Sequence, residues 1–95
     1  MKHCILVKWN GLIKDKHDIA KEVKNIFDQL LDIDGIHGVS YRENCIDRAN
    51  RYDLLICIDL DKEVLPVYDE SNPHHEWKEK YGKFVENKAI FDFEE

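Results

Sequence analysis

The pattern of apolar and polar positions predicts four strands and two helical regions. Residues 2–9 alternate as a strand does, and both faces of that strand are largely apolar. A helix is predicted from about residue 17, capped by Asp15 or Asp18 and ended by a left-handed Gly35. Its apolar side chains recur at helical spacing on one face. They are Ile19, Val23, Ile26, Phe27 and Leu30.

The remaining strands are predicted at residues 36–44, 51–60 and 88–93. The run from Leu54 to Ile58 is apolar at successive positions, which predicts a central strand covered on both faces. Residues 62–86 show a broken helical pattern. Pro66 fits the first turn of a short helix, and Asn72 before Pro73 fits a cap followed by a second helix.

The order strand–helix–strand–strand–helix–strand predicts a ferredoxin-like α+β fold that occupies residues 1–95 as one domain. In this fold both helices cover one face of a four-stranded antiparallel sheet. We expect the other face to carry a large apolar patch, which soluble monomers rarely expose. The sequence therefore predicts a homodimer in which two sheets pack face to face as a dimeric α+β barrel. The side chains expected on that patch are His3, Ile5, Val7, Trp9 and Tyr41.

The charge and cysteine content narrow the classes of partner. A net charge of −6 argues against nucleic acid and against an anionic membrane surface, since both need clustered Lys and Arg. No apolar stretch is long enough to span a membrane. Cys4, Cys45 and Cys57 show no metal-type spacing, so no metal or other cofactor is predicted. We expect them to be small buried hydrophobic residues in a reducing cytoplasm.

Several short segments, in order over the full length, resemble the stress-responsive α/β-barrel domain family. That resemblance implies a dimer of ferredoxin-like subunits whose two sheets form one barrel. The matching segments are Lys2 to Trp9, Gly35-Ile36, Asn44, Tyr52-Asp53-Leu54, Tyr68, Asn72 to His75, and Ile90 to Phe93.

The family's signature on the second helix is roughly Tyr-x-x-His-Pro-x-His, and this sequence departs from it. If Tyr68 is aligned, the final histidine falls on His74; if Pro73 is aligned, it falls on His75. We prefer His74, because on a helical wheel it lies near the face of the apolar Trp77 and His75 does not. A plant polyketide cyclase of this family works without a cofactor. Its working residues resemble His74, Tyr68, His3 and Asp92.

These four residues are the candidate catalytic residues, with His75 as the alternative base. An aldol-type closure needs a base that takes a proton next to a carbonyl and a donor for the enolate oxygen. A neutral His74 could be that base and Tyr68 that donor. Asp92 could orient the imidazole of His74, and His3 could line the cavity.

Three functions remain open on the sequence alone. The first is a homodimer that binds a small apolar or polyketide-like ligand in the barrel, with no chemistry assigned. The second is a cofactor-independent enzyme of the cyclase, aldolase or isomerase type. The third is a structural or interaction dimer with a filled barrel. The residues expected to contact a ligand are Ile5, Val7, Trp9, Tyr41 and Trp77.

Overall fold

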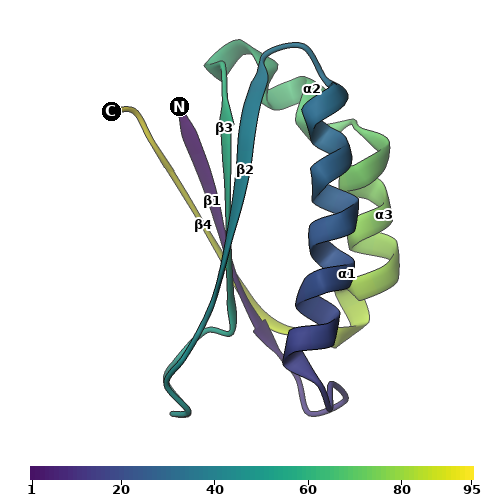
Figure 1. Ribbon diagram of the computed structural model, residues 1–95, viewed down its shortest axis with the longest axis vertical. Coiled ribbons are helices and arrows are strands. Elements are labelled where there is room, and N and C mark those ends of the chain that lie inside the picture. The colour runs from purple at the N-terminus through teal and green to yellow at the C-terminus, as the bar shows by residue number, and fades with distance from the viewer.

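The computed structural model describes residues 1–95 as two layers, a sheet and a set of helices on one of its faces (Figure 1). The strands are β1 Lys2–Trp9, β2 Ile36–Glu43, β3 Leu54–Leu60 and β4 Val85–Phe93. The helices are α1 Lys16–Asp28, α2 Leu65–Asp69 and α3 Asn72–Tyr81, with short 3-10 turns at Gln29–Asp32, Lys62–Val64 and Gly82–Phe84. None of these helices is both long enough and apolar enough to cross a membrane.

The sheet order is β2-β3-β1-β4, and every neighbouring pair is antiparallel. This order confirms the ferredoxin-like fold and the central place of β3. Lys2 of β1 pairs with Phe93 of β4, so the two ends of the chain lie close together at one end of the sheet (Figure 1). The first and last strands are thus neighbours in the sheet, so side chains from the two ends of the sequence can contact each other.

The core lies between the sheet and the helices. All five apolar side chains predicted on one helical face are buried there, four of them in α1 and Leu30 in the 3-10 turn that follows it. Trp9, Phe27 and Trp77 pack edge to face, with ring centroids 5.6 to 6.1 Å apart. Such aromatic pairs add about 0.5–1.5 kcal/mol each beyond the area that they bury.

Local sequence signals set the helix ends. The Asp15 side chain accepts a hydrogen bond from the backbone N–H of Asp18 and caps α1. Gly35 has a φ of 91°, in the left-handed region predicted for it, but it does not end the helix: α1 ends at Asp28, the 3-10 turn ends at Asp32, and Gly35 precedes β2. The predicted cap of α3 was wrong by one residue: Ser71, not Asn72, accepts from the backbone N–H of His74. A serine hydroxyl is as good an N-cap as an amide, and it leaves Pro73 within the first turn.

The face of β1 that we expected to point away from the helices is the face that the helices cover. Ile5, Val7 and Trp9 are at most 4% exposed and belong to the core, and Tyr41 also packs against that core. The predicted alternation of side chains in β1 is confirmed. Because both faces of the strand are apolar, the pattern did not show which face the helices cover.

The bare face of the sheet carries the other set of side chains. In β1 these include Cys4 and Leu6, which lie opposite Cys57 and Leu55 of β3. In β4, Phe91 is 67% exposed and Phe93 shares its face, as predicted for these two residues. The apolar patch predicted for one face of the sheet is therefore present, with different members. We call it the bare face: Cys4, Leu6, Leu55, Cys57, Ala89, Phe91 and Phe93.

Candidate functional site

The four candidate catalytic residues form one polar and aromatic cluster on the helix side of the sheet. His3 of β1 and Asp92 of β4 lie directly opposite each other, and His3 Nδ1 hydrogen-bonds Asp92 Oδ1. His3 is only 5% exposed, whereas the Asp92 side chain is partly open to solvent. A buried imidazole needs such a partner, and this one fixes the orientation of the ring.

Tyr68 of α2 lies between the two histidines. Its ring centroid is 5.3 Å from that of His3 and 4.8 Å from that of His74. The residue is 1% exposed, and burial raises the pKa of its hydroxyl, which therefore stays protonated at neutral pH. Because the tyrosine hydroxyl takes part in none of the side-chain hydrogen bonds of the structure, it has a proton to donate to a ligand.

His74, in the first turn of α3, is half-buried and has a defined tautomer. Its Nδ1 lies 2.9 Å from the backbone carbonyl oxygen of Asp69. A carbonyl can only accept, so Nδ1 carries the proton and Nε2 keeps a free lone pair. Burial lowers the pKa of His74, and the positive charges of Lys78 and Lys88 act in the same direction. His74 is thus a neutral imidazole with an unprotonated nitrogen near pH 7.

The structure distinguishes the two histidines at the start of α3. His74 faces Tyr68, and His75 is exposed to solvent. The expected contact between Asp92 and His74 was wrong. Asp92 pairs with His3, and the carbonyl of Asp69 orients the imidazole of His74 in its place. Sequence spacing could not reveal this, because a backbone carbonyl has no signature in side-chain identity.

A surface hollow of about 280 Å³ lies between α3 and β4, and its first lining residues on α3 follow His74 by about one helix turn. It is lined by Trp77, Lys78, Gly82, Val85 and Lys88. On β4, side chains of alternate residues share a face, so Ile90 and Asp92 follow Lys88 along the same side. Ile90 is 52% exposed there, which leaves apolar surface between the hollow and the His3–Asp92 pair.

Of the five residues expected to bind a ligand, two line hollows and three lie in the core. Trp77 lines the hollow between α3 and β4. Tyr41 lines a smaller hollow of about 190 Å³ beside α1, and its hydroxyl donates to Asp28 at 2.8 Å. Ile5, Val7 and Trp9 are packed in the core, and none of them lines any of the five main hollows. They were expected between two sheets, and the helices cover them instead.

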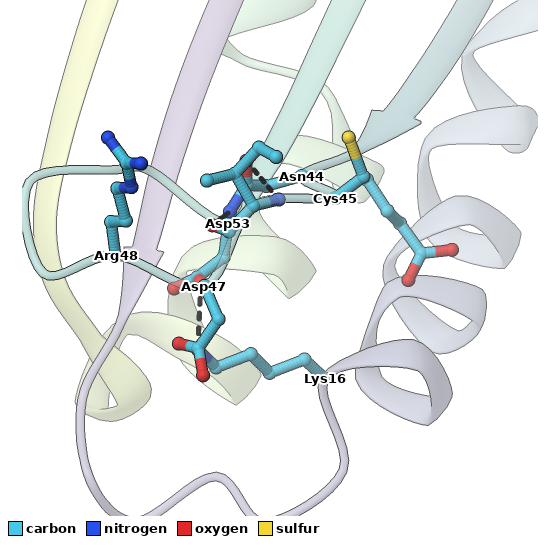
Figure 2. Close-up of a pocket in the computed structure, with 8 residues that line it drawn as sticks. Lys16, Asn44, Cys45, Asp47, Arg48 and Asp53 are labelled. Atoms are coloured by element: carbon cyan, nitrogen blue, oxygen red, sulfur yellow. Dashed lines mark hydrogen bonds and ion pairs between the residues drawn. The ribbon is translucent and has the colours of Figure 1, made fainter.

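Another hollow, of about 360 Å³, lies at the opposite end of the sheet from the two termini, and it was missed by the sequence reasoning. Figure 2 shows its side chains, which come from α1, from the end of β2 and the loop after it, and from the residue before β3. Asn44 orders the loop, because its side chain donates to the Ile46 carbonyl at 2.6 Å. The labelled residues are Lys16, Asn44, Cys45, Asp47, Arg48 and Asp53.

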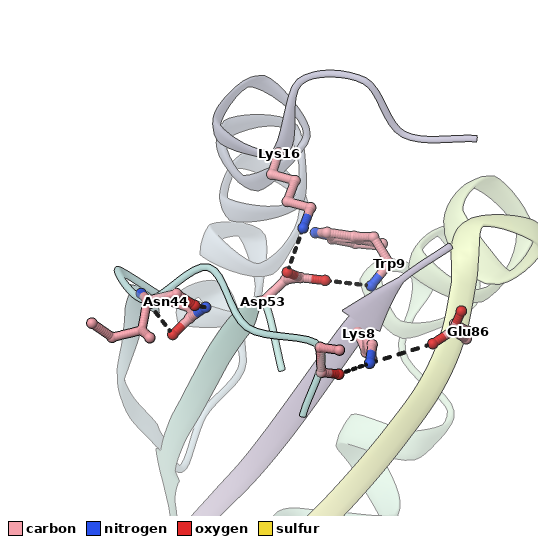
Figure 3. A network of polar contacts seen from close by, with 8 residues as sticks. Lys8, Trp9, Lys16, Asn44, Asp53 and Glu86 are labelled. Atoms are coloured by element: carbon pink, nitrogen blue, oxygen red, sulfur yellow. Dashed lines mark hydrogen bonds and ion pairs between the residues drawn. The ribbon is translucent and has the colours of Figure 1, made fainter. Parts of the chain in front are cut away.

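Asp53 connects three elements at this end. Its carboxylate accepts from the backbone N–H of Trp9 at 2.7 Å and from Lys16 Nζ at 2.9 Å (Figure 3). Beside it, Lys8 bonds the Ala49 carbonyl and lies 3.6 Å from Glu86. All the strong acceptors of this network are thus already paired within the chain. The network fixes the end of β1, the start of α1 and the loop, and we assign it a structural role.

The side chains offer no evident metal centre. No group of three or more His, Cys, Asp or Glu side chains is placed to hold a metal ion. The histidines at 74 and 75 face different surroundings, as adjacent residues on a helix must. The side chains of His3, Tyr68, His74 and Asp92 can donate and accept hydrogen bonds and can transfer protons.

Comparison with known proteins finds solved structures of similar fold. No family model and no curated protein matches this sequence. A dimeric protein of unknown function with a ferredoxin-like fold from Bacteroides fragilis is similar in structure, with a TM-score of 0.82 at 16% identity over 99% of this chain and 94% of that protein. The hydroxynitrile lyase of Passiflora edulis has a TM-score of 0.75 at 10% identity, over 97% of this chain and 89% of the lyase.

A third similar structure carries a family name. It is a dabb family protein with a ferredoxin-like fold from Mesorhizobium loti, with a TM-score of 0.66 at 12% identity over 99% of this chain and 94% of that protein. These likenesses confirm the ferredoxin-like α+β fold. They are consistent with the stress-responsive α/β-barrel (dabb) family that the sequence resembles.

Proposed function

We propose that this chain is a homodimer that binds a small, mainly apolar carbonyl compound and moves a proton on it without a cofactor. One observation carries the proposal. The imidazole of His74 is held neutral with Nε2 unprotonated, and its ring centroid lies 4.8 Å from that of the buried Tyr68. A base and a hydrogen-bond donor side by side are what the formation of an enolate needs.

The proposed reaction begins with His74 Nε2. It takes a proton from the carbon next to the carbonyl, the electron pair of that C–H bond forms a C=C bond, and the π pair of the C=O bond moves to the carbonyl oxygen. The Tyr68 hydroxyl donates a hydrogen bond to this enolate oxygen. Return of the proton from His74 to a different carbon of an extended enolate, with the carbonyl re-formed, completes an isomerisation. In a cyclisation, the enolate carbon instead attacks a second carbonyl of the same molecule, the first carbonyl re-forms, and the new alkoxide takes the proton from His74.

His3 and Asp92 act as positioning residues in this proposal. His3 supports one side of the Tyr68 ring, and Asp92 fixes the imidazole of His3. The hollow between α3 and β4 would hold the apolar part of the ligand, against Trp77 and near the exposed Ile90. The similar hydroxynitrile lyase supports this choice, because it shows that the fold can carry an enzyme of small molecules.

Homodimerisation is the second part of the proposal. The bare face presents contiguous apolar side chains over three strands, including the exposed Phe91 and Phe93. A second copy would cover this surface and remove it from water at about 25 cal/mol for each Å² of apolar area. The dimeric state of the similar Bacteroides fragilis protein supports this arrangement. A cytoplasmic location stays a prediction.

The test of proton transfer does not need the natural substrate. Alkyl β-keto esters of increasing chain length are incubated with the protein in deuterated water, and loss of the acidic C–H signal is followed by proton NMR. We expect exchange faster than in buffer, with H74A and Y68F each slowed by about 100-fold or more. The matched control is H75A, which removes an exposed histidine from the same helix turn and should exchange like the wild type.

Exchange no faster than in buffer for every ester, or an H74A protein as fast as the wild type, would refute the proton-transfer proposal. That outcome would favour the interaction dimer with a filled interior. The packed Trp9, Phe27 and Trp77 rings support this second candidate, because they belong to the core between the sheet and the helices.

A further inference from the structure

Two cysteines face each other at the centre of the bare face. Cys4 of β1 and Cys57 of β3 are direct partners in the antiparallel register. Their sulfurs are 2.8 Å apart, and both thiols are free. The third cysteine, Cys45, is exposed in the loop after β2 and belongs to neither strand. The fold thus brings together two thiols that are 53 positions apart in the sequence.

The backbone at this pair already meets the geometric needs of a disulfide. Directly opposite residues of an antiparallel pair have Cα atoms roughly 4.5 or 5.5 Å apart, and both values lie inside the range that disulfides occupy. The two sulfurs would have to approach by roughly 0.8 Å to reach a bond length of about 2.05 Å. Small changes of the two χ1 angles can supply this, so no strand has to move.

We propose that Cys4 and Cys57 form a reversible dithiol–disulfide couple, a modification site that is oxidised by hydrogen peroxide or by small disulfides. The two thiols differ in access. Cys4 is 8% exposed, and burial together with its hydrogen bond to Cys57 raises the pKa of Cys4 to about 12. Cys57 is the more open of the two, and so it reacts first.

The oxidation by peroxide is balanced in two steps. The thiolate of Cys57 attacks one peroxide oxygen, the O–O bond breaks, and the released hydroxide takes a proton to leave as water. The sulfur of Cys4 then attacks the resulting sulfenic sulfur of Cys57, loses its proton, and expels the second oxygen as water. Two electrons pass from the sulfurs to the peroxide. A dithiol reductant returns both thiols by exchange.

The bond would join the two central strands of the sheet, on the face that we propose for dimerisation. It would close a loop that contains α1 and β2, and this restricts the unfolded chain. The inference does not depend on the proton-transfer proposal, because the cysteines lie on the opposite face of the sheet from His3 and Tyr68. Pairing of two copies would slow the entry of oxidant without changing the product.

The experiment uses the full chain with Cys45→Ser, so that only the two facing thiols remain. Dilute reduced protein is treated with hydrogen peroxide, and in parallel with graded ratios of reduced and oxidised glutathione. The samples are then alkylated and weighed as intact protein. We expect both alkylation sites to disappear together, with a mass lower by two hydrogens and full recovery in dithiothreitol. A linked peptide pair containing Cys4 and Cys57 would identify the bond.

The variants Cys4→Ser and Cys57→Ser, each added to Cys45→Ser, are the controls. Each should stop at a sulfenic acid or a mixed disulfide with glutathione. The proposal is overturned if the two-thiol protein keeps both alkylatable sites under oxidant, gains oxygen atoms without a link, or forms only links between chains. Since the two-thiol protein keeps every residue of the pair, poor folding of either control leaves the decisive measurement intact.

Discussion

His3 on β1 and Asp92 on β4 are hydrogen-bonded across the antiparallel pair, although 89 positions separate them in the sequence. The pair joins the first strand to the last at the edge of the cluster that holds Tyr68. The imidazole is buried, and the carboxylate reaches solvent. The orientation of His3, and through it the support of the Tyr68 ring, therefore depends on an aspartate from the final strand.

Replacing Asp92 tests this dependence. Asp92→Ala leaves a ring nitrogen of buried His3 without its partner, and we expect a loss of about 1–3 kcal/mol in the free energy of unfolding. Asp92→Asn keeps an acceptor and should lose less. Urea denaturation followed by circular dichroism measures both. Glu94→Ala, which removes a carboxylate bonded to Lys62 on the surface, is the control and should change little. An Asp92→Ala protein as stable as this control would contradict the assigned role.

The lowered pKa of His74 predicts a dependence on pH with a definite sign. The ordinary value is 6.5, and burial of the imidazole disfavours the charged form in the folded state. Below pH 6.5 the His74 ring therefore binds a proton more readily in the unfolded chain than in the folded one. This favours the unfolded state, so the free energy of unfolding falls as the pH falls from 6.5 towards the folded pKa. Proton NMR of the ring signal that disappears in H74A should show a midpoint below 6.5. A midpoint at or above that value would contradict the prediction.

Charge on the bare face should separate the two copies. Phe91 is 67% exposed in the subunit, so Phe91→Glu costs the folded monomer little but would bury a carboxylate in the dimer. We expect a folded monomer by light scattering after gel filtration, against a dimer for the wild type. Ile90→Glu is the matched control. Ile90 directly precedes Phe91 in β4 and is also exposed, but it lies on the opposite face of the sheet. This variant should stay dimeric. A dimeric Phe91→Glu protein or a monomeric wild type would refute the proposed interface.

Asp53 should be needed for the stability of one end of the sheet. Asp53→Ala leaves the backbone N–H of Trp9 and the ammonium of Lys16 without their acceptor, and we expect a loss of about 1–3 kcal/mol. Asp53→Asn still accepts from Trp9 and should lose less. Asp47→Ala, in the exposed part of the same hollow, serves as the control. Equal urea midpoints for the alanine variants at 47 and 53 would show that the network contributes nothing.

The elements of this fold could be predicted because local signals agree with the tertiary structure. The apolar side chains of α1 and of the 3-10 turn after it keep helical spacing over five positions, and the prolines at 66 and 73 each fall within the first turn of a helix. Strand β3 reads as central because it is apolar on both faces. Each of these signals lies within one element, and the element needs no partner to display it.

Relations between elements were not available in the same way. Since β1 is apolar on both faces, nothing within it shows that Ile5 meets the helices and Leu6 does not. The choice depends on the direction in which the chain crosses the sheet after residue 9. The partner of His74 is a backbone carbonyl, and Asp53 looks like any polar residue before a strand. The candidate cluster was found in part through the family resemblance, and its hydrogen bonds only through the fold.

Position 35 requires glycine, because both the backbone conformation and the packing there exclude a side chain. Its φ of 91° is one that L side chains rarely adopt, and a Cβ atom would lie 2.4 Å from Cγ2 of Val64. Gly35→Ala should therefore lower the free energy of unfolding by roughly 2–5 kcal/mol, measured in urea. Adding Val64→Ala removes the contact and should recover part of the loss, because the backbone cost remains. Gly38→Ala is the control, since a Cβ there meets nothing within 4 Å. If Gly35→Ala and Gly38→Ala unfold at the same urea concentration, this turn does not need a left-handed glycine.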